Sequence, residues 1–277
     1  MTARSDYTEY PLKRKVTQYI LNHAELHCDE NELRKHLVRV LKYNETYAST
    51  LARQIVTILS IERDLEDEPL QLTSKDIPAE LFRVIIQCIS PAQRYKILSN
   101  STLCGVTALS QYTEWKRDDI VEIILDSMNE DERYNLLKGS CWIIGTTALK
   151  SACRSGNKEL VKIIKRHVSK DNWYQLLLQQ HHFDSDFCSP LQSAVSGGHI
   201  DIVKFVHGSV TAEQWYELLQ LKSWFINNTA LHKAALKGHT EVMMFIHPSV
   251  TAEQWYELLQ IKDEHEFTAL NTAASEG

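Results

Sequence analysis

The chain has 277 residues, of which 43% are hydrophobic, with only 6 Pro and 9 Gly; this composition can bury a large core and favours helices over sheets. The net charge of −6 and the pI near 6.1 exclude the strongly basic surface of a nucleic-acid-binding domain. No stretch approaches membrane-spanning length, the N-terminus has no apolar signal core, and the 6 cysteines form no C-x-x-C pair. We therefore expect a cytoplasmic protein that has buried free thiols and does not insert into a membrane.

Residues 1–67 are predicted to contain three helices, near 11–26, 30–42 and 45–62. They carry no copy of the repeat that occupies the rest of the chain. We expect this segment to be a helical cap that closes one end of the repeat stack, because terminal units need a polar outer face. The alternative is a small helical signalling module joined to the repeats.

Histidines near the N-terminus raise the question of a metal site. His23 and His27 are four residues apart with Glu25 between them, a spacing that can share a metal on one helix face. The order is not H-E-x-x-H and no P-C-x-x-C follows, so a solvated helix face is favoured over a metal-dependent catalyst. The set of His181, His182 and Cys188 matches no zinc spacing either. We expect no metal, no cofactor and no enzymatic activity.

One dodecapeptide, SVTAEQWYELLQ, occurs twice, at 209–220 and at 249–260. Thr211 and Gln214 have the spacing of a capping box, and Val210 and Trp215 that of a hydrophobic staple. The Trp and the two Leu of the segment share one helix face, and we expect both aromatic residues of the segment to lie in the core between units. Weaker copies follow the same design, and the shared aromatic position is occupied by Tyr95, Tyr134, Tyr174, Tyr216 and Tyr256.

A second motif recurs with the same period, close to 40 residues. Thr-Ala-Leu begins at 107, 147, 229 and 268, and Ser-Pro-Leu begins at 189. A short apolar helix follows each motif, then in most copies a Gly-His or Gly-Asn turn that needs a left-handed residue. A second helix with a continuous apolar stripe comes next, as at 158–165, 201–206 and 241–246.

The segment TALHKAALKGHTEVMMFI, at 229–246, resembles the ankyrin repeat, whose signature is a T-P-L-H-x-A-A helix, a Gly-His turn and a second apolar helix. The resemblance covers 68–277 and implies an all-α fold, an ankyrin-like α-solenoid with an N-terminal helical cap or small helical module. Each unit is too small to bury its apolar stripe alone, so stacking must cover it. The expected units are 68–106, 107–146, 147–188, 189–228, 229–267 and a partial unit at 268–277.

The sequence departs from the ankyrin pattern in two respects. Its period is near 40 residues rather than about 33, and the added residues carry the W-Y helix as a third helix of the unit. Only His232 keeps the histidine of the motif, so we do not expect the Thr–His hydrogen bonding in most units. Its place is taken elsewhere by Ser110, Lys150, Gln192 and Asn271.

The resemblance implies a binding face made by the ends of the first helices and by the loops before them. Aromatic and Arg side chains are the usual anchors of protein interfaces. Trp142 and Trp224 have an alternative role, which is to seal their loops against the next unit. The expected partner-binding residues are Glu114, Trp115, Trp142, Arg154, Ser155, Phe183, Ser196, Gly197, Trp224, Phe225, Lys233, Leu236 and Lys237.

The function expected from these features is that of a non-enzymatic scaffold that presents a concave face to a protein partner. The alternative is the sensing or targeting arm of a larger signalling protein or host-directed effector, whose catalytic activity lies outside this chain. The stop inside a sixth unit, at Gly277, suggests a fragment of a longer protein. The apolar surface of an open last unit is expected to favour end-to-end self-association.

Overall fold

The computed structural model describes residues 35, 75, 77–88, 91–99, 107–139, 146–180 and 188–276. Secondary structure in these ranges is α-helical, apart from the 3-10 turn η1 (His247–Ser249) and an isolated antiparallel bridge between Lys262 and Thr268. The predicted all-α class is confirmed. The helices predicted within 1–67 lie outside the described residues, except that residue 35 is helical.

The chain divides into two compact units, one formed by 1–102 with 119–129 and the other by 103–118 with 130–277. The described helices of the smaller unit are α4 (Ala79–Cys88), α5 (Pro91–Ser99) and most of α7 (Asp118–Asp126). Their core includes Phe82, Leu98 and Ile124, each 0% exposed. The Arg94 guanidinium of α5 donates from Nη1 to the Ser127 carbonyl oxygen at 2.9 Å.

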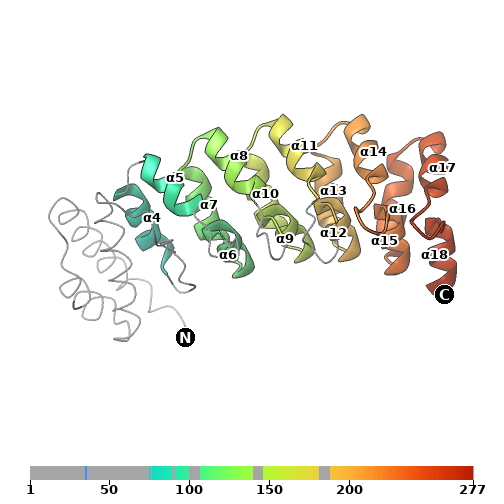
Figure 1. The fold of residues 1–277 in the computed structure, drawn as a ribbon, viewed down its shortest axis with the longest axis horizontal. Helices are drawn as coiled ribbons and strands as arrows, with labels where there is room; N and C mark the ends of the chain where they lie inside the picture. Colours follow the sequence, from blue (N-terminus) through green and yellow to red (C-terminus); the bar gives the residue numbers. More distant parts are fainter. Residues whose placement is uncertain are drawn as a thin grey trace, which may run out of the picture. The chain divides into compact units, whose positions relative to one another are not determined.

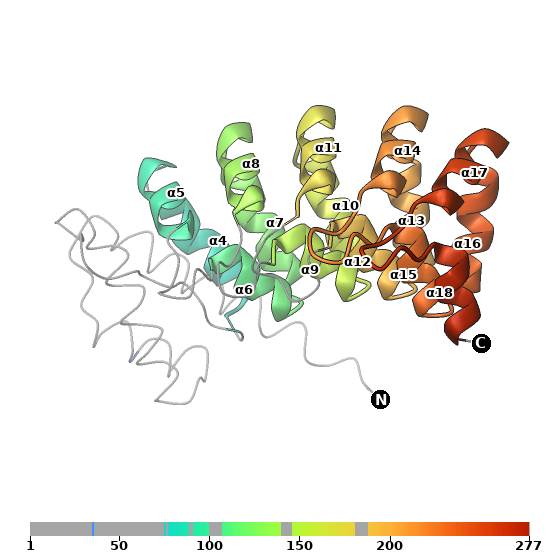
Figure 2. The same ribbon diagram turned by 45° about the vertical axis from the view of Figure 1, so that its right-hand side comes forward.

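In the larger unit, like helices of successive repeats lie side by side in three rows (Figures 1 and 2). The first row contains α6 (Ala108–Glu114), α9 (Ala148–Arg154), α12 (Pro190–Ser196), α15 (Ala230–Leu236) and α18 (Ala269–Glu276). The second row contains α10 (Lys158–Arg166), α13 (Ile200–His207) and α16 (Thr240–Ile246). The third row contains α8 (Glu130–Lys138), α11 (Lys170–Leu178), α14 (Ala212–Gln220) and α17 (Ala252–Gln260).

The core of this unit repeats with the sequence. In the first row, Leu149, Leu191 and Leu231 are each 0% exposed. The fully buried Ala152, Ala194 and Ala234 sit three positions further on and have no bulk to hold neighbouring helices apart. Each buried Leu removes enough apolar surface from water to stabilise the fold by about 1.5–3 kcal/mol, so stacking stabilises what an isolated repeat cannot.

The third helices bury the tryptophan of the duplicated segment but not its tyrosine. Trp173 and Trp215 are 0% and 1% exposed, whereas Tyr174 and Tyr216 are only partly buried. The prediction that both aromatics lie in the core is therefore wrong for the tyrosines. Neighbouring residues on a helix point about 100° apart, so one residue of the pair faces the stack while the other reaches its edge.

The first helices are capped even where the motif has lost its histidine. Thr107 with Ser110, Ser189 with Gln192, and Thr229 with His232 each form a reciprocal capping box. Thr268 donates from its backbone N to Asn271 Oδ1 at 3.0 Å. The Thr–His bond itself is described at Thr229 and His232, where the motif keeps its histidine. In other first helices Ser, Gln or Asn places an acceptor within reach of the cap, which was not predicted. Lys150 carries no acceptor, and there Thr147 only accepts from the Lys150 backbone N.

Candidate functional site

The ends of the first helices form a row along α9, α12 and α15, which we call the turn row (residues 154–155, 196–197 and 236–237). Arg154, Ser155 and Lys237 are exposed, Ser196 is half-buried and Leu236 is 37% exposed. These side chains differ in charge and size from one repeat to the next, although the backbone beneath them repeats. Such variation on a constant frame is how repeat proteins distinguish partners.

Hydrogen bonds between repeats hold the turn row in place. Gly156, Gly198 and Gly238 follow the helix ends with φ of 73°, 70° and 65°, values that favour glycine. The His199 ring packs on Gly156, where a Cβ would lie 2.7 Å from His199 Cε1. His199 Nε2 lies 3.0 Å from the Arg154 carbonyl oxygen, and His239 Nε2 lies 3.0 Å from that of Ser196. Each turn is thereby fixed to the one before it.

The turn after α6 is built differently. Lys116 occupies the place of the glycine with φ of 57°, and Glu114 before it is exposed. Trp115 is half-buried and packs edge-on against Tyr112, with ring centroids 5.6 Å apart. Asn157 Nδ2 donates to the Asp118 carboxylate at 2.8 Å, which joins this turn to the next repeat. Trp115 is therefore partly accessible and partly used for packing against Tyr112.

Residues 221–228, between α14 and α15, form what we call the aromatic loop. Trp224 and Phe225 at its tip are 59% and 61% exposed. Beneath them Ser223 is fully buried, and it donates from its backbone N to the Asn228 carbonyl oxygen at 2.8 Å. The Asn228 backbone N donates back to Ser223 Oγ at 3.0 Å. The tip is therefore carried on a closed, hydrogen-bonded base.

The aromatic loop is also held by the first helix α12 on one side and by the following repeat on the other. Gln192 of α12 is fully buried and donates from Nε2 to the carbonyl oxygens of Leu221 and Asn228, at 2.6 and 2.9 Å. On the other side, the Glu264 backbone N donates to the Ile226 carbonyl oxygen at 3.2 Å. The exposed aromatic rings therefore stand on a backbone that is bonded on both sides.

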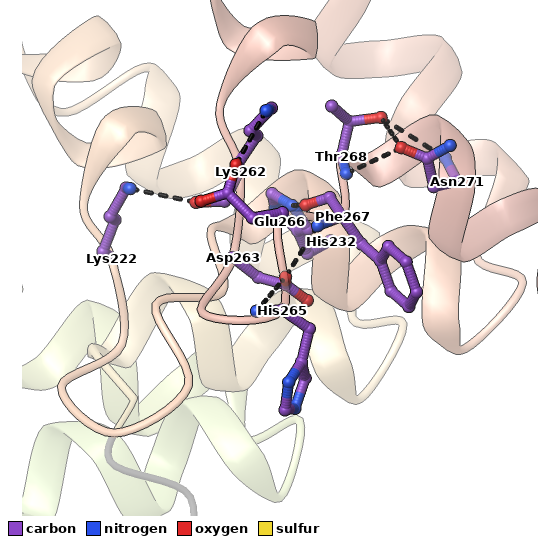
Figure 3. A network of polar contacts seen from close by, with 9 residues as sticks. All are labelled: Lys222, His232, Lys262, Asp263, His265, Glu266, Phe267, Thr268 and Asn271. Atoms are coloured by element: carbon purple, nitrogen blue, oxygen red, sulfur yellow. Dashed lines mark hydrogen bonds and ion pairs between the residues drawn. The ribbon is translucent and has the colours of Figure 1, made fainter.

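The next loop, residues 261–267, repeats this arrangement with other side chains (Figure 3). The Asp263 carboxylate accepts from the backbone N of His265 at 2.8 Å and of Phe267 at 2.9 Å. Lys222 donates to the Lys262 carbonyl oxygen at 3.0 Å, and Lys262 pairs with Glu266 at 2.7 Å, which lowers the pKa of that carboxyl. The Phe267 ring points away from these contacts and is 53% exposed.

Phe267 was not among the partner-binding residues predicted from the sequence. Trp224 and Phe225 were predicted because they shortly precede a Thr-Ala-Leu motif, and Phe267 directly precedes the next one at Thr268. The exposed Phe267 extends the set of loop aromatics by one repeat.

His232 joins the first helix α15 to the loop 261–267. Its Nε2 lies 3.0 Å from the Phe267 carbonyl oxygen, which can only accept, so Nε2 carries the proton and Nδ1 accepts from the Thr229 backbone N. Burial lowers the pKa of His232 below 6.5, opposed by the bond to Phe267. The ring is therefore a neutral structural link, in the role that Gln192 has one repeat earlier.

One predicted contact residue is buried, and two others cannot be located. Lys233 is only 8% exposed, because α15 is enclosed between α12 and α18, so its assignment as a partner contact is corrected. Trp142 and Phe183 lie outside the described residues. Trp224 and Phe225 precede α15, whereas Leu236 is its last residue and Lys237 its C-cap, so most of this seven-residue helix, about 10 Å long, lies between the two groups.

Several predicted or reactive residue types were located in the structure. No group of three or more His, Cys, Asp and Glu side chains among the described residues is placed to hold a metal ion. Cys153 and Cys188 are buried, and burial raises the pKa of the Cys153 thiol to about 12, which keeps it protonated. His23, His27, His181 and His182 lie outside the described residues. None of the described helices has the length and apolar character needed to span a bilayer.

The crystal structure of the ankyrin repeat domain of Bcl-3, described as a unique member of the IkappaB protein family, is similar to this structure. The TM-score is 0.53 and the identity 17%, with 95% of this chain and 93% of that chain covered. The chain has an ankyrin-repeat fold. No protein-family model and no curated protein matches the sequence. The ankyrin-like architecture inferred from the motifs is thus confirmed at the level of the fold.

Within the ankyrin-repeat fold, the third helix of each repeat is the distinguishing feature of this chain. The row formed by α8, α11, α14 and α17 occupies the residues that lengthen the period to about 40. The turn row and the aromatic loop are carried by the first helices and the segments that precede them.

Proposed function

We propose that this protein is a non-enzymatic, cytoplasmic scaffold that binds a protein partner across the first-helix row, from the aromatic loop to the turn row. The observation that carries the proposal is the exposure of Trp224 and Phe225, 59% and 61%, on a loop whose backbone is hydrogen-bonded to α12 and to the following repeat. The repeat boundaries set out from the sequence, and the cap role of 1–67, belong to the same proposal.

A fixed loop with exposed aromatics suits protein recognition for a thermodynamic reason. Burying a large ring supplies much of the binding energy of an interface, and truncating such an anchor typically costs 2 kcal/mol or more. Ordering a mobile loop on binding opposes association, and a loop that is already bonded avoids most of that cost. The two buried thiols, Cys153 and Cys188, support a reducing compartment.

The partner is expected to contact both ends of α15. Leu236 and Lys237 offer an apolar and a cationic side chain at one end, and the two aromatic residues stand before the other. A partner that spans this distance, about 10 Å, would engage both groups at once. A partner that contacts only one end would depend on only one of them.

The test is affinity capture from the native cell followed by measurement of Kd with each purified partner. Trp224→Ala combined with Phe225→Ala is expected to weaken binding roughly thirtyfold or more, the equivalent of about 2 kcal/mol. Met244→Ala is the matched control, because Met244 is 70% exposed but lies on α16, away from the loop. If the double variant keeps every partner at unchanged Kd, the assigned surface is wrong.

A further inference from the structure

The third helices are joined by a hydrogen bond that recurs from repeat to repeat. Trp173 of α11 donates from Nε1 to Ser209 Oγ at 2.9 Å, and Trp215 of α14 donates from Nε1 to Ser249 Oγ at 2.9 Å. In both cases the serine stands two residues before the Thr that caps the next third helix. The bond therefore positions the start of each third helix against the tryptophan of the helix before it.

A second bond accompanies the first. The Tyr174 hydroxyl donates to the Glu217 carboxylate, and the Tyr216 hydroxyl donates to the Glu257 carboxylate. Burial and the nearby Glu257 raise the pKa of Tyr216 to about 12, so the phenol stays protonated and can donate. Each contact between third helices thus uses two donors, Trp and Tyr, and two acceptors, Ser and Glu.

The last third helix, α17, has the donors without the acceptors. Its sequence is that of α14, so Trp255 and Tyr256 occupy the positions of Trp215 and Tyr216. Within the described part of the chain, neither Trp255 Nε1 nor the Tyr256 hydroxyl is bonded. Tyr256 is 66% exposed, and Trp255 is partly exposed where Trp215 is buried.

The first-row helix α18 also exposes an apolar side chain that is buried in its counterparts. Leu270 of α18 is 58% exposed, whereas Leu191 and Leu231, at the same position of α12 and α15, are 0% exposed. Those helices are packed against the second helices of their own repeats, α13 and α16. The surface of α17 and α18 therefore combines two unused donors with an uncovered leucine, and we call it the open face (Trp255, Tyr256 and Leu270).

We propose that the open face binds a helix pair of the same design as residues 239–260. In the bound pair, a serine two residues before the helix cap accepts from Trp255 Nε1, and a glutamate accepts from the Tyr256 hydroxyl. This interface continues the one that the chain already forms between α11 and α14 and between α14 and α17. The proposal is independent of the partner surface on the aromatic loop and the turn row.

The sequence offers a direct test in the full chain. Thr268–Gly277 aligns with Thr229–Gly238 without a gap, so a copy of residues 239–260 fused after Gly277 continues the repeat in register. The extended chain is expected to have a higher Tm than the original. In it, hydrogen exchange of the Trp255 indole N–H, assigned by its loss in Trp255→Phe, should slow roughly tenfold or more.

Two sets of variants separate specific bonding from general packing. Ser249→Ala and Glu257→Gln, made only in the appended copy, should cancel most of the slowing at Trp255 and part of the rise in Tm. Trp255→Phe and Tyr256→Phe should lower the Tm of the extended chain more than that of the original chain, where the donors are unused.

Two outcomes would overturn the proposal. One is an extension that leaves both Tm and Trp255 exchange unchanged while circular dichroism shows that the added segment is helical. The other is concentration-dependent dimerisation of the original chain that Trp255→Phe abolishes, because the open face would then belong to a second copy of the chain rather than to an added helix pair.

Discussion

The two copies of SVTAEQWYELLQ are identical in sequence and differ in everything that depends on neighbours. Both form a helix from Ala to Gln, α14 and α17, and both begin with the same reciprocal capping box between Thr and Gln. Trp215 is 1% exposed and bonded to Ser249, whereas Trp255 is partly exposed and its indole N–H is unused. The difference shows that the segment encodes its own start and shape, while the adjacent repeat provides its burial.

The tryptophans give the largest expected difference between the two copies. Trp215→Ala removes a fully buried ring together with its hydrogen bond to Ser249 and leaves a cavity, so we expect a loss of about 3–5 kcal/mol of unfolding free energy. Trp255→Ala should cost about 1 kcal/mol, since its ring is already partly solvated. Urea denaturation of the two variants measures the difference, and equal losses would contradict the role of the neighbouring repeat.

The N-terminal caps of α14 and α17 should contribute equally to the unfolding free energy. Thr211→Ala and Thr251→Ala each remove a hydroxyl that accepts from the backbone N three residues on, at 3.2 Å in both copies. Each variant is expected to lose about 1 kcal/mol of unfolding free energy, because a cap acts within its own helix. A much smaller loss for Thr251→Ala than for Thr211→Ala would contradict this, because the contribution of the cap would then depend on the adjacent repeat.

The tyrosines test the hydrogen bond at the solvent-exposed edge of the contact between third helices, where a smaller loss of unfolding free energy is expected. Tyr216→Phe deletes only the hydroxyl that bonds Glu257, and we expect a loss of about 0.5 kcal/mol because the pair is open to solvent. Tyr256→Phe should leave the unfolding free energy unchanged. The same urea titrations measure both, with Glu257→Gln as the control that weakens the acceptor without removing it.

A final comparison concerns Gln192 and His232, each of which joins a first helix to the loop that precedes the next first helix; only His232 can titrate. Burial lowers the pKa of His232 below its unfolded value near 6.5. The folded state therefore binds the proton less readily, so the stabilising contribution of the neutral ring is present above pH 6.5 and is lost as the pH falls through the lowered pKa. His232→Gln should leave stability at pH 7.5 nearly unchanged and reduce its decline between pH 6.5 and pH 5, as followed by Tm.

Much of this architecture could be predicted from local patterns. The period, the Thr-Ala-Leu starts, the glycine turns and the burial of Trp215 follow from spacing and capping rules that act within a few residues. The capping role of Ser110, Gln192 and Asn271 was missed, because it depends on the reach of one acceptor atom rather than on resemblance to a motif.

The exposure of individual side chains was predicted less well from the sequence than the positions of the helices and turns. Lys233 is enclosed between α12 and α18, and the tyrosines of the third helices reach the edge of the stack. Phe267 stands exposed on a loop shaped by Asp263, which no repeat pattern marks. Whether a side chain meets solvent depends on the helices packed around it, and a single repeat contains no information about where its neighbours stop.

By itself, the sequence determined the length of the repeat, the residue at which each helix begins and the left-handed turns, because these depend on hydrogen bonds and steric limits between residues close along the chain. Only the tertiary structure decided which of two identical helices is sealed and which is open, and that Trp224 and Phe225 stand on a bonded base. This burial and bonding joins residues 29 to 45 positions apart, and only the folding and stacking of the repeats brings such residues together.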